Sequence, residues 1–138
     1  TLEGSPSETK GFNCDENKLT DLIGSPTTVK GHFDCNYNNL TSLKGCPKII
    51  TGSFFCTNNN LTQIDDLPDY LYNKFICTGN PIGSIFNKVN LDFLQAFKTY
   101  RVIKGDTVNL KRLRYVMSLF NETIYQGLRE VRKYYTVK

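Results

Sequence analysis

The cysteines are the residues of this 138-residue chain whose type and spacing most suggest a chemical site. Four of the five, Cys14, Cys35, Cys56 and Cys77, are 21 residues apart. Four thiolates suit zinc, but side chains in one row about 4.8 Å apart on successive strands cannot surround a metal tetrahedrally. We therefore predict a column of buried, unpaired thiols and no metal or cofactor. Cys46 lies outside the series, and we expect it to be partly exposed.

His32 is the only histidine of the chain. Asp34 shares its predicted strand face, but no nucleophile stands beside the two. We interpret His32 as a surface polar contact. Because the sequence offers no other constellation of nucleophile, base and acid, it predicts a protein that is not an enzyme.

The cysteine spacing belongs to a 21-residue repeat, which can be written F-x-C-x-x-N-x-L-T-x-L-x-G-x-P. Other residue types keep the same step: Pro26, Pro47 and Pro68; Phe33, Phe54 and Phe75; Asn17, Asn38, Asn59 and Asn80. Such a period, held through four copies, predicts a solenoid. Residues 2–6 match residues 22–26 and look like the tail of an earlier unit, so we expect a fragment of a longer protein.

Within each unit, one segment alternates with the period of a strand, as in residues 29–35 and 50–56. Val, Gly, Phe and Cys occupy the inward face, and mostly polar residues occupy the outward face. We expect the rest of each unit to be extended or polyproline-like, because 21 residues leave no room for a long helix.

The outward residues are the candidate protein-binding site. The selected residues are His32, Asp34, Phe55, Tyr72, Lys74 and Ile76. Phe55 and Ile76 place apolar side chains on neighbouring strands within a polar rim, which is typical of a protein-binding patch. The alternative is that the C-terminal helices fold back over these side chains.

Helical spacing replaces the repeat after Ile85. Asn90 is the expected N-cap of a helix that runs to about Tyr100, and residues 105–107 break it. Leu110, Leu113, Met117 and Phe120 mark one face of a second helix. A third would carry Ile124, Leu128, Val131 and Tyr135. We predict that these helices cap the open edge of the last repeat.

Charge divides the chain at the same place. Residues 1–82 hold six Lys and nine acidic residues, a net charge of −3, whereas residues 83–138 have a net charge of +7. The predicted basic patch consists of Lys111, Arg112, Arg114, Arg129, Arg132 and Lys133. It is either a solvated helical face or a surface for an acidic protein or nucleic acid, since interleaved tyrosines could stack on bases.

The string from Cys35 to Leu43, with its Asn38 and Leu40, resembles the L-x-x-N-x-L core of leucine-rich repeats. The short, proline-containing unit is similar to the compact repeats of secreted bacterial effectors, and residues 43–62 look most like leucine-rich-repeat proteins of tailed bacteriophages. The resemblance implies a curved parallel sheet whose concave face binds another macromolecule, and it implies no catalytic residues. It covers residues 2–85, and the helical tail also resembles the segment that follows such repeats.

We therefore expect an α+β fold, a leucine-rich-repeat solenoid with a parallel β-sheet over residues 1–86 and a basic helical C-terminal cap over residues 87–138. The expected function is a non-enzymatic protein–protein interaction module. The resemblance implies a phage-encoded protein that binds a host or phage protein, and one use of such binding is to modulate or inhibit a host bacterial protein such as a defence factor. The alternative is a nucleic-acid-associated protein that uses the basic helices. Free thiols suit the cytoplasm, and no apolar stretch is long enough for a membrane span.

Overall fold

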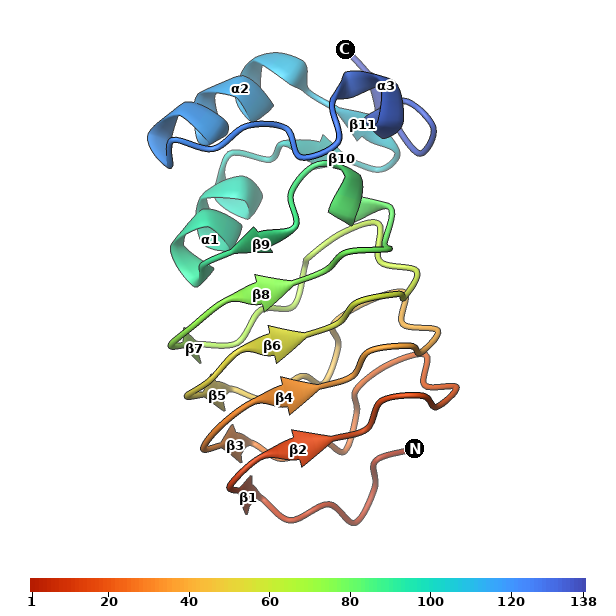
Figure 1. Ribbon diagram of the computed structural model, residues 1–138, viewed down its shortest axis with the longest axis vertical. Coiled ribbons are helices and arrows are strands. Elements are labelled where there is room, and N and C mark those ends of the chain that lie inside the picture. Colours follow the sequence, from red (N-terminus) through yellow and green to blue (C-terminus); the bar gives the residue numbers. More distant parts are fainter.

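Each 21-residue unit of the computed structural model, which describes residues 1–138, makes one turn that contains two short strands (Figure 1). The first strands of successive turns pair in parallel in the order β1-β3-β5-β7. They are β1 (Glu8–Thr9), β3 (Thr28–Val29), β5 (Ile49–Ile50) and β7 (Tyr70–Leu71). The second strands form a five-stranded sheet in the order β2-β4-β6-β8-β9. They are β2 (Phe12–Asn13), β4 (Phe33–Asp34), β6 (Phe54–Phe55), β8 (Phe75–Ile76) and β9 (Lys88–Val89), the last antiparallel. The predicted parallel-strand solenoid is confirmed.

The structure differs from the expected single strand over residues 29–35. The chain bends between the two strands of each turn, at Gly31 in one turn and at Gly52 in the next. Each turn therefore contributes one strand to each of two sheets. A Cβ atom at Gly52 would lie 2.6 Å from the carbonyl carbon of Gly31, so these two turns can stack this closely only with glycine at position 52, whereas the next turn has Asn73 there. The predicted alternation survives the bend, because Val29, Phe33 and Cys35 are all fully buried.

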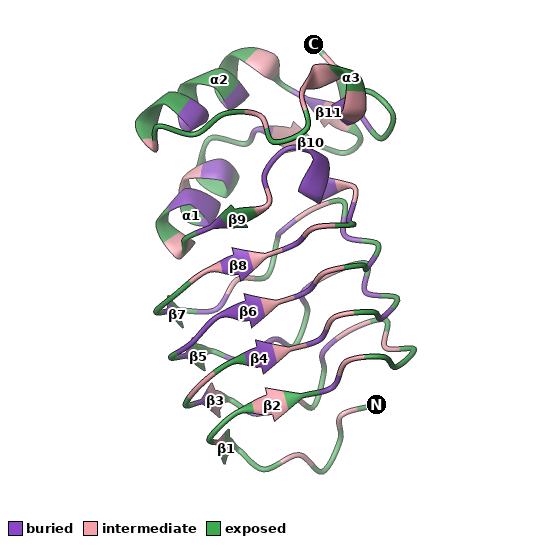
Figure 2. Cartoon of the chain, viewed as in Figure 1, coloured by how far each residue is buried: buried purple, intermediate pink, exposed green.

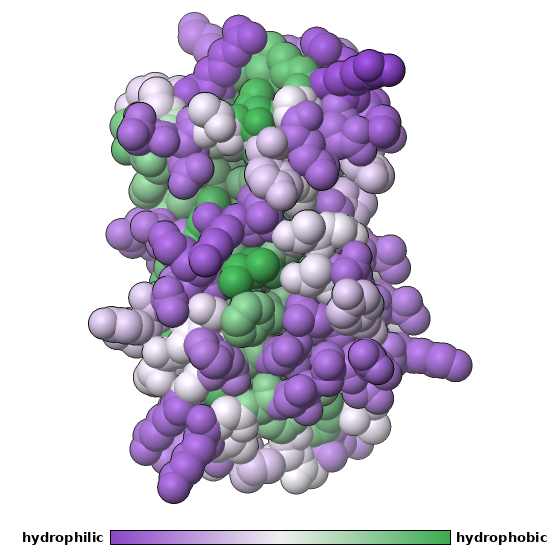
Figure 3. Space-filling view, viewed as in Figure 1, coloured by the Kyte–Doolittle hydropathy of each residue, from purple (hydrophilic) through white to green (hydrophobic).

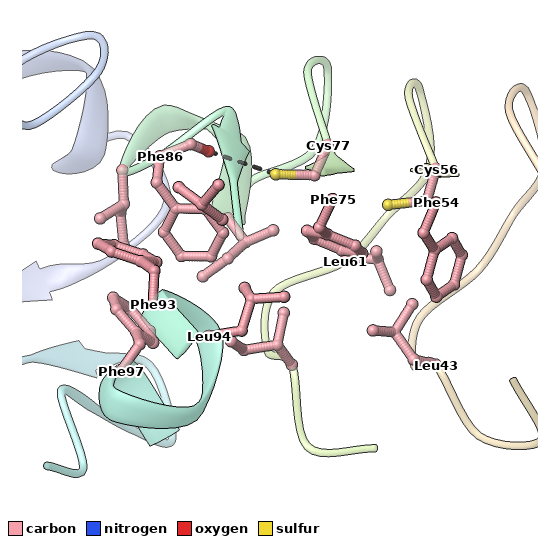
Figure 4. Close-up of a cluster of buried hydrophobic side chains, with 14 of the residues drawn as sticks. Leu43, Phe54, Cys56, Leu61, Phe75, Cys77, Phe86, Phe93, Leu94 and Phe97 are labelled. Carbon is pink, nitrogen blue, oxygen red and sulfur yellow. Dashed lines mark hydrogen bonds between the residues drawn. The ribbon is translucent and has the colours of Figure 1, made fainter. Parts of the chain in front are cut away.

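Equivalent side chains of successive turns lie in columns inside the solenoid (Figure 4), and buried residues alternate with exposed ones along each turn (Figure 2). The rings of Phe33 and Phe54 lie 5.2 Å apart edge to face, and those of Phe54 and Phe75 lie 5.3 Å apart. This edge-to-face arrangement is the favourable one for aromatic pairs. One continuous core of 30 buried residues runs from Cys14 in the first full turn to Tyr135 in the cap.

The cysteine column lies beside the phenylalanines and is buried, as predicted. Each thiol donates to a main-chain carbonyl of the next layer: Cys35 Sγ lies 3.2 Å from the Phe55 oxygen, and Cys77 Sγ lies 3.3 Å from the Phe86 oxygen (Figure 4). The expectation for Cys46 is wrong, since its side chain is buried with 8% exposed. The loop of the next turn covers it, with the Asp66 oxygen 3.9 Å from Cys46 Sγ.

A ladder of asparagines closes the turn that follows each second strand. Asn59 Nδ2 donates to the carbonyls of Cys56 and Cys35, both at 3.1 Å, and Asn59 Oδ1 accepts from Leu40 N at 3.0 Å. Asn38 and Asn80 repeat this pattern one turn away on either side. Each buried amide therefore ties its own turn to the preceding one.

The C-terminal cap stands on the last turn of the solenoid (Figure 1). After the 3-10 helix Ile82–Ser84 and β9 come α1 (Leu91–Thr99) and α2 (Leu110–Leu119). Asn90 and Asn109 are their N-caps, and each side chain accepts the main-chain N–H three residues on at 2.9 Å. The apolar face of α1, with Phe93 and Phe97, packs around Phe86 at ring distances of 5.1 and 5.0 Å. The predicted cap is confirmed.

Two parts of the cap differ from expectation. Residues 105–107 do not merely end a helix: β10 (Ile103–Lys104) and β11 (Thr107–Val108) form a hairpin around them, and Gly105 adopts a φ of 60°. The third helix, α3 (Leu128–Val131), has only four residues, because the chain then extends into β12 (Thr136–Val137), which pairs in parallel with β11. None of the helices has the length and apolar content needed to cross a lipid bilayer.

Candidate functional site

The outer face of the five-stranded sheet carries the candidate binding residues in a fixed order. Strand register places Asp34, Phe55, Ile76 and Lys88 in one row across β4, β6, β8 and β9. Their neighbours along each strand point the other way into the core, where Phe33, Phe54 and Phe75 are fully buried. The row therefore runs from an acidic side chain through two apolar ones to a basic one.

Phe55 and Ile76 are adjacent in this row and half-buried. The space-filling view shows hydrophobic surface over the middle of β6 and β8, with hydrophilic side chains on both sides (Figure 3). The cap helices stand at the end of the solenoid and do not lie across these strands (Figure 1). The alternative in which the helices fold back over Phe55 and Ile76 therefore does not describe this structure.

His32 packs against this apolar pair. Its ring meets the Phe55 ring edge to face, with centroids 5.4 Å apart. Its Nδ1 accepts a hydrogen bond from Ser53 N at 2.9 Å, which fixes the ring orientation and assigns the proton of the neutral imidazole to Nε2. Asp34 makes a different bond, since its Oδ1 accepts from Asn36 N at 3.0 Å. The imidazole and the Asp34 carboxylate are thus held by separate main-chain groups and do not pair.

The remaining predicted residues lie at two different places. Lys74 is half-buried and occupies in its own turn the position that His32 and Ser53 occupy in theirs. Tyr72 lies at the corner between β7 and β8 and is 73% exposed. That Tyr72 extends the apolar patch stays a prediction.

Sequence reasoning missed Lys88, which ends the row. Its strand, β9, pairs antiparallel with β8 and places Lys88 opposite Ile76. The repeat stops before this segment, so no periodic position in the sequence pointed to it. Its only local signal was alternation, with Lys88 exposed beside the buried Val89.

The buried thiols are poorly suited to chemistry. All five cysteines are unpaired. Burial raises the pKa of the Cys14 thiol to about 12, with smaller contributions from Asp34 and Asp15. Burial also raises the pKa of Cys46 to about 12, and it raises the pKa values of Cys35 and Cys56 well above 9.0. Because the thiolate is the reactive and metal-binding form, these side chains are inert in the folded protein. No group of three or more His, Cys, Asp or Glu side chains could hold a metal ion.

The predicted basic residues are all exposed but do not share one element. Lys111, Arg112 and Arg114 lie on α2, whereas Arg129, Arg132 and Lys133 lie on or just after α3. Lys133 Nζ is 2.6 Å from a carboxylate oxygen of Glu130, so its charge is partly neutralised. The same contact raises the pKa of Lys133.

The structure consists of a 21-residue parallel solenoid, a row of side chains on its outer face and a C-terminal cap. Comparison of the chain with protein-family models, curated proteins and solved structures found no match. A fold alone does not determine a function, so the geometry and chemistry of the side chains must indicate what this protein binds.

Proposed function

We propose that this protein is a non-enzymatic protein-binding module and that its partner docks on the outer face of the five-stranded sheet. The observation that carries the proposal is the adjacent pair Phe55 and Ile76, half-buried and left uncovered by the cap. Soluble proteins seldom expose contiguous apolar side chains within a polar rim without a binding role. The backbone beneath the pair is held by strands that are paired on both sides, parallel between β4, β6 and β8 and antiparallel between β8 and β9, so little order must be gained on binding.

The order of the row indicates the chemistry of the partner. Asp34 flanks the apolar pair on the side of β4, and Lys74 and Lys88 lie toward the cap. A complementary partner presents an apolar side chain over Phe55 and Ile76, a basic group toward Asp34 and an acidic group toward the lysines. Such charge matching contributes more to orientation and association rate than to affinity.

The resemblance to leucine-rich repeats refines the proposal. The buried asparagine ladder and the 21-residue parallel turn support a leucine-rich-repeat solenoid, and the string over residues 43–62 supports the bacteriophage type. On this basis the partner is a host bacterial protein, for example a defence factor, and the module modulates or inhibits its activity. Five unpaired thiols support action in the reducing cytoplasm.

A capture experiment with a matched control tests the site. The tagged protein, Phe55→Ala with Ile76→Ala, and Ile49→Ala are each incubated with bacterial lysate, and the retained proteins are identified by mass spectrometry. Ile49 is the control because it is 39% exposed on the other sheet. We expect one protein to be retained by the parent and by Ile49→Ala but lost with the double variant. Equal retention by all three would show that the partner docks elsewhere.

A further inference from the structure

The cap contains a cationic cavity that the sequence does not reveal. It has a volume of about 670 Å³ and lies between the β10–β11 hairpin, the start of α2 and the end of the chain. Four basic side chains line it: Arg101, Lys104, Arg112 and Lys138. Only Arg112 belongs to the basic patch predicted from sequence. The volume falls within the range of roughly 300–1,000 Å³ that is usual for ligand sites.

Long-range pairing brings these four cations together. Arg101 follows α1 and adopts a left-handed φ of 49°, which is uncommon for a side chain other than glycine or asparagine. Lys104 lies on β10, and Arg112 lies in the first turn of α2. Lys138 lies at the cavity because β12 pairs in parallel with β11, and the Lys138 carbonyl accepts a hydrogen bond from Leu110 N at 2.7 Å.

No carboxylate forms an ion pair with these side chains. The two ion pairs of the protein, Lys30–Glu8 and Lys133–Glu130, lie elsewhere. The nearest acid in sequence is Asp106 in the hairpin turn, whose carboxylate accepts from the Thr107 hydroxyl at 3.3 Å. Arg112 Nη1 donates to the Arg101 carbonyl at 3.3 Å, which orients one cation without neutralising it. Four unpaired cations around one cavity create a field that attracts anions.

Two tyrosines are close in sequence to lining residues of this cavity, although they do not line it themselves. The Tyr100 and Tyr115 rings are 5.1 Å apart at 74° and are 41% and 49% exposed. Tyr100 directly precedes Arg101, and Tyr115 lies three residues, or about one helical turn, after Arg112. Exposed aromatic rings beside cations are the combination with which proteins bind unpaired nucleobases and their phosphates.

We propose that this cavity binds single-stranded nucleic acid, with backbone phosphates among the four cations and a base against the Tyr100–Tyr115 pair. A duplex fits less well, because its bases are already stacked and cannot reach the tyrosines. The site is separate from the outer face of the five-stranded sheet and does not depend on protein binding there.

Fluorescence anisotropy with labelled dT12, rU12 and a 12-base-pair duplex, measured at several salt concentrations, tests the proposal with the full chain. We expect both single strands to bind more tightly than the duplex. The logarithm of the association constant should fall with the logarithm of salt by roughly 0.7 per phosphate contact, or about 3 for four contacts. Excess inorganic phosphate or mononucleotide should compete only weakly, because neither spans all four cations.

Matched double variants localise the site. Arg101→Gln with Arg112→Gln should weaken single-strand binding at least tenfold and reduce the salt slope by about 1.4. Lys104→Gln with Lys138→Gln should act in the same direction and serves as the second test should the first pair fail to fold. Arg129→Gln with Arg132→Gln, at α3 and outside the cavity, should change binding less than twofold. Tyr115→Ala should weaken binding about tenfold at an unchanged salt slope.

Three results would overturn the proposal. The first is no binding of either single strand at low salt, and the second is duplex binding as tight as single-strand binding. The third is an equal loss from the cavity pair and the α3 pair, which would indicate diffuse attraction to the whole basic cap.

Discussion

At the scale of the residue, the buried thiols and the asparagine amides of the ladder each have a defined neighbour. The thiols of the cysteine column each point at a main-chain carbonyl of the next layer, 3.2–3.4 Å away for Cys14, Cys35, Cys56 and Cys77. A thiol is a weak donor and behaves as a small apolar side chain. The column is therefore sensitive to charge and to size, and two predictions concern Cys56, which is fully buried.

Replacement of Cys56 by aspartate should unfold the repeat region. The carboxylate would lie in the apolar column without a cation, and an uncompensated buried charge costs roughly 3–5 kcal/mol. Thermal and urea unfolding should show a loss of that size. Cys46→Ser is the control, because a hydroxyl can still donate toward the Asp66 carbonyl and should cost about 1 kcal/mol. A Cys56→Asp protein as stable as the parent would mean that this side chain does not face the core.

Stability should also fall as the pH rises above 9. Burial raises the pKa values of Cys35 and Cys56 well above 9.0, so the folded protein keeps protons that the unfolded chain releases. The folded state then binds more protons, and each such thiol lowers the free energy of unfolding by about 1.4 kcal/mol per pH unit. Below pH 8 this term vanishes. Urea unfolding between pH 8 and 10.5 in the presence of reductant measures this decline in the free energy of unfolding. Cys56→Ala should reduce its slope by the contribution of one thiol, about 1.4 kcal/mol per pH unit. An identical slope in the variant would contradict the assignment.

Other residue-scale features could not be read from the sequence. Glu16, Tyr37 and Asn58 have φ values of 52°, 52° and 54°, and Gly79 in the next turn has 75°. Every turn thus needs a left-handed residue at this position, although glutamate and tyrosine seldom adopt it. After Tyr37 and Asn58, the following asparagine bonds across turns, a contact that exists only once the turns are stacked.

At the scale of the element, hydrogen bonds between turns replace long strands. Each strand has only two residues, so the parallel ladders alone are short. Asn59 adds two bonds between its own turn and the preceding one, to Leu40 N and the Cys35 carbonyl, and one bond within its own turn, to the Cys56 carbonyl. Tyr135 ties the cap to the solenoid in a similar way, since its hydroxyl donates to the Thr62 carbonyl at 2.8 Å. Burial raises the pKa of Tyr135, so its hydroxyl keeps this proton.

Asn59→Ala should be far more damaging than Asn17→Ala. The first change leaves the Leu40 N–H without a partner in the core, and a buried unpaired group costs about 1–3 kcal/mol. It also removes one of the two amides bonded to each of the Cys35 and Cys56 carbonyls, which keep Asn38 and Asn80. We expect a total loss of roughly 3 kcal/mol in urea unfolding. Asn17 is exposed and bonds only within its own turn, so its loss should cost less than 1 kcal/mol. Equal effects of the two changes would show that the ladder does not join the turns.

Elements that repeat were predictable, and elements that occur once were not. Periodicity predicted the inward phenylalanines and cysteines, and the N-cap Asn90 and the apolar face of α2 followed from local spacing. The strand β12 pairs with β11 of the hairpin across 29 residues, from Thr107 to Thr136, which no local pattern records. The cationic cavity was missed for the same reason, because Lys104 and Lys138 meet only through this pairing.

At the scale of the whole molecule, charge and shape distinguish two surfaces. The repeat region of residues 1–82 is acidic, and residues 83–138 are basic, with net charges of −3 and +7. The sheet face offers an apolar pair between opposite charges, whereas the cap offers cations around a cavity. The candidate face could be assigned from sequence because strand alternation specifies which side chains point outward. The ordering of its charges toward Lys88 needed the antiparallel β9.

The most direct test of the central claim is the affinity of the captured partner for the parent and for Phe55→Ala with Ile76→Ala, measured by calorimetry alongside the melting temperature. Truncation of an interface anchor typically costs about 2 kcal/mol, or roughly 30-fold in affinity. Both side chains are only half-buried, so the melting temperature should fall by less than about 5 °C. The account predicts at least a 30-fold loss of affinity with this small change in stability. Unchanged affinity in a stably folded double variant would contradict it and would place the partner on another surface.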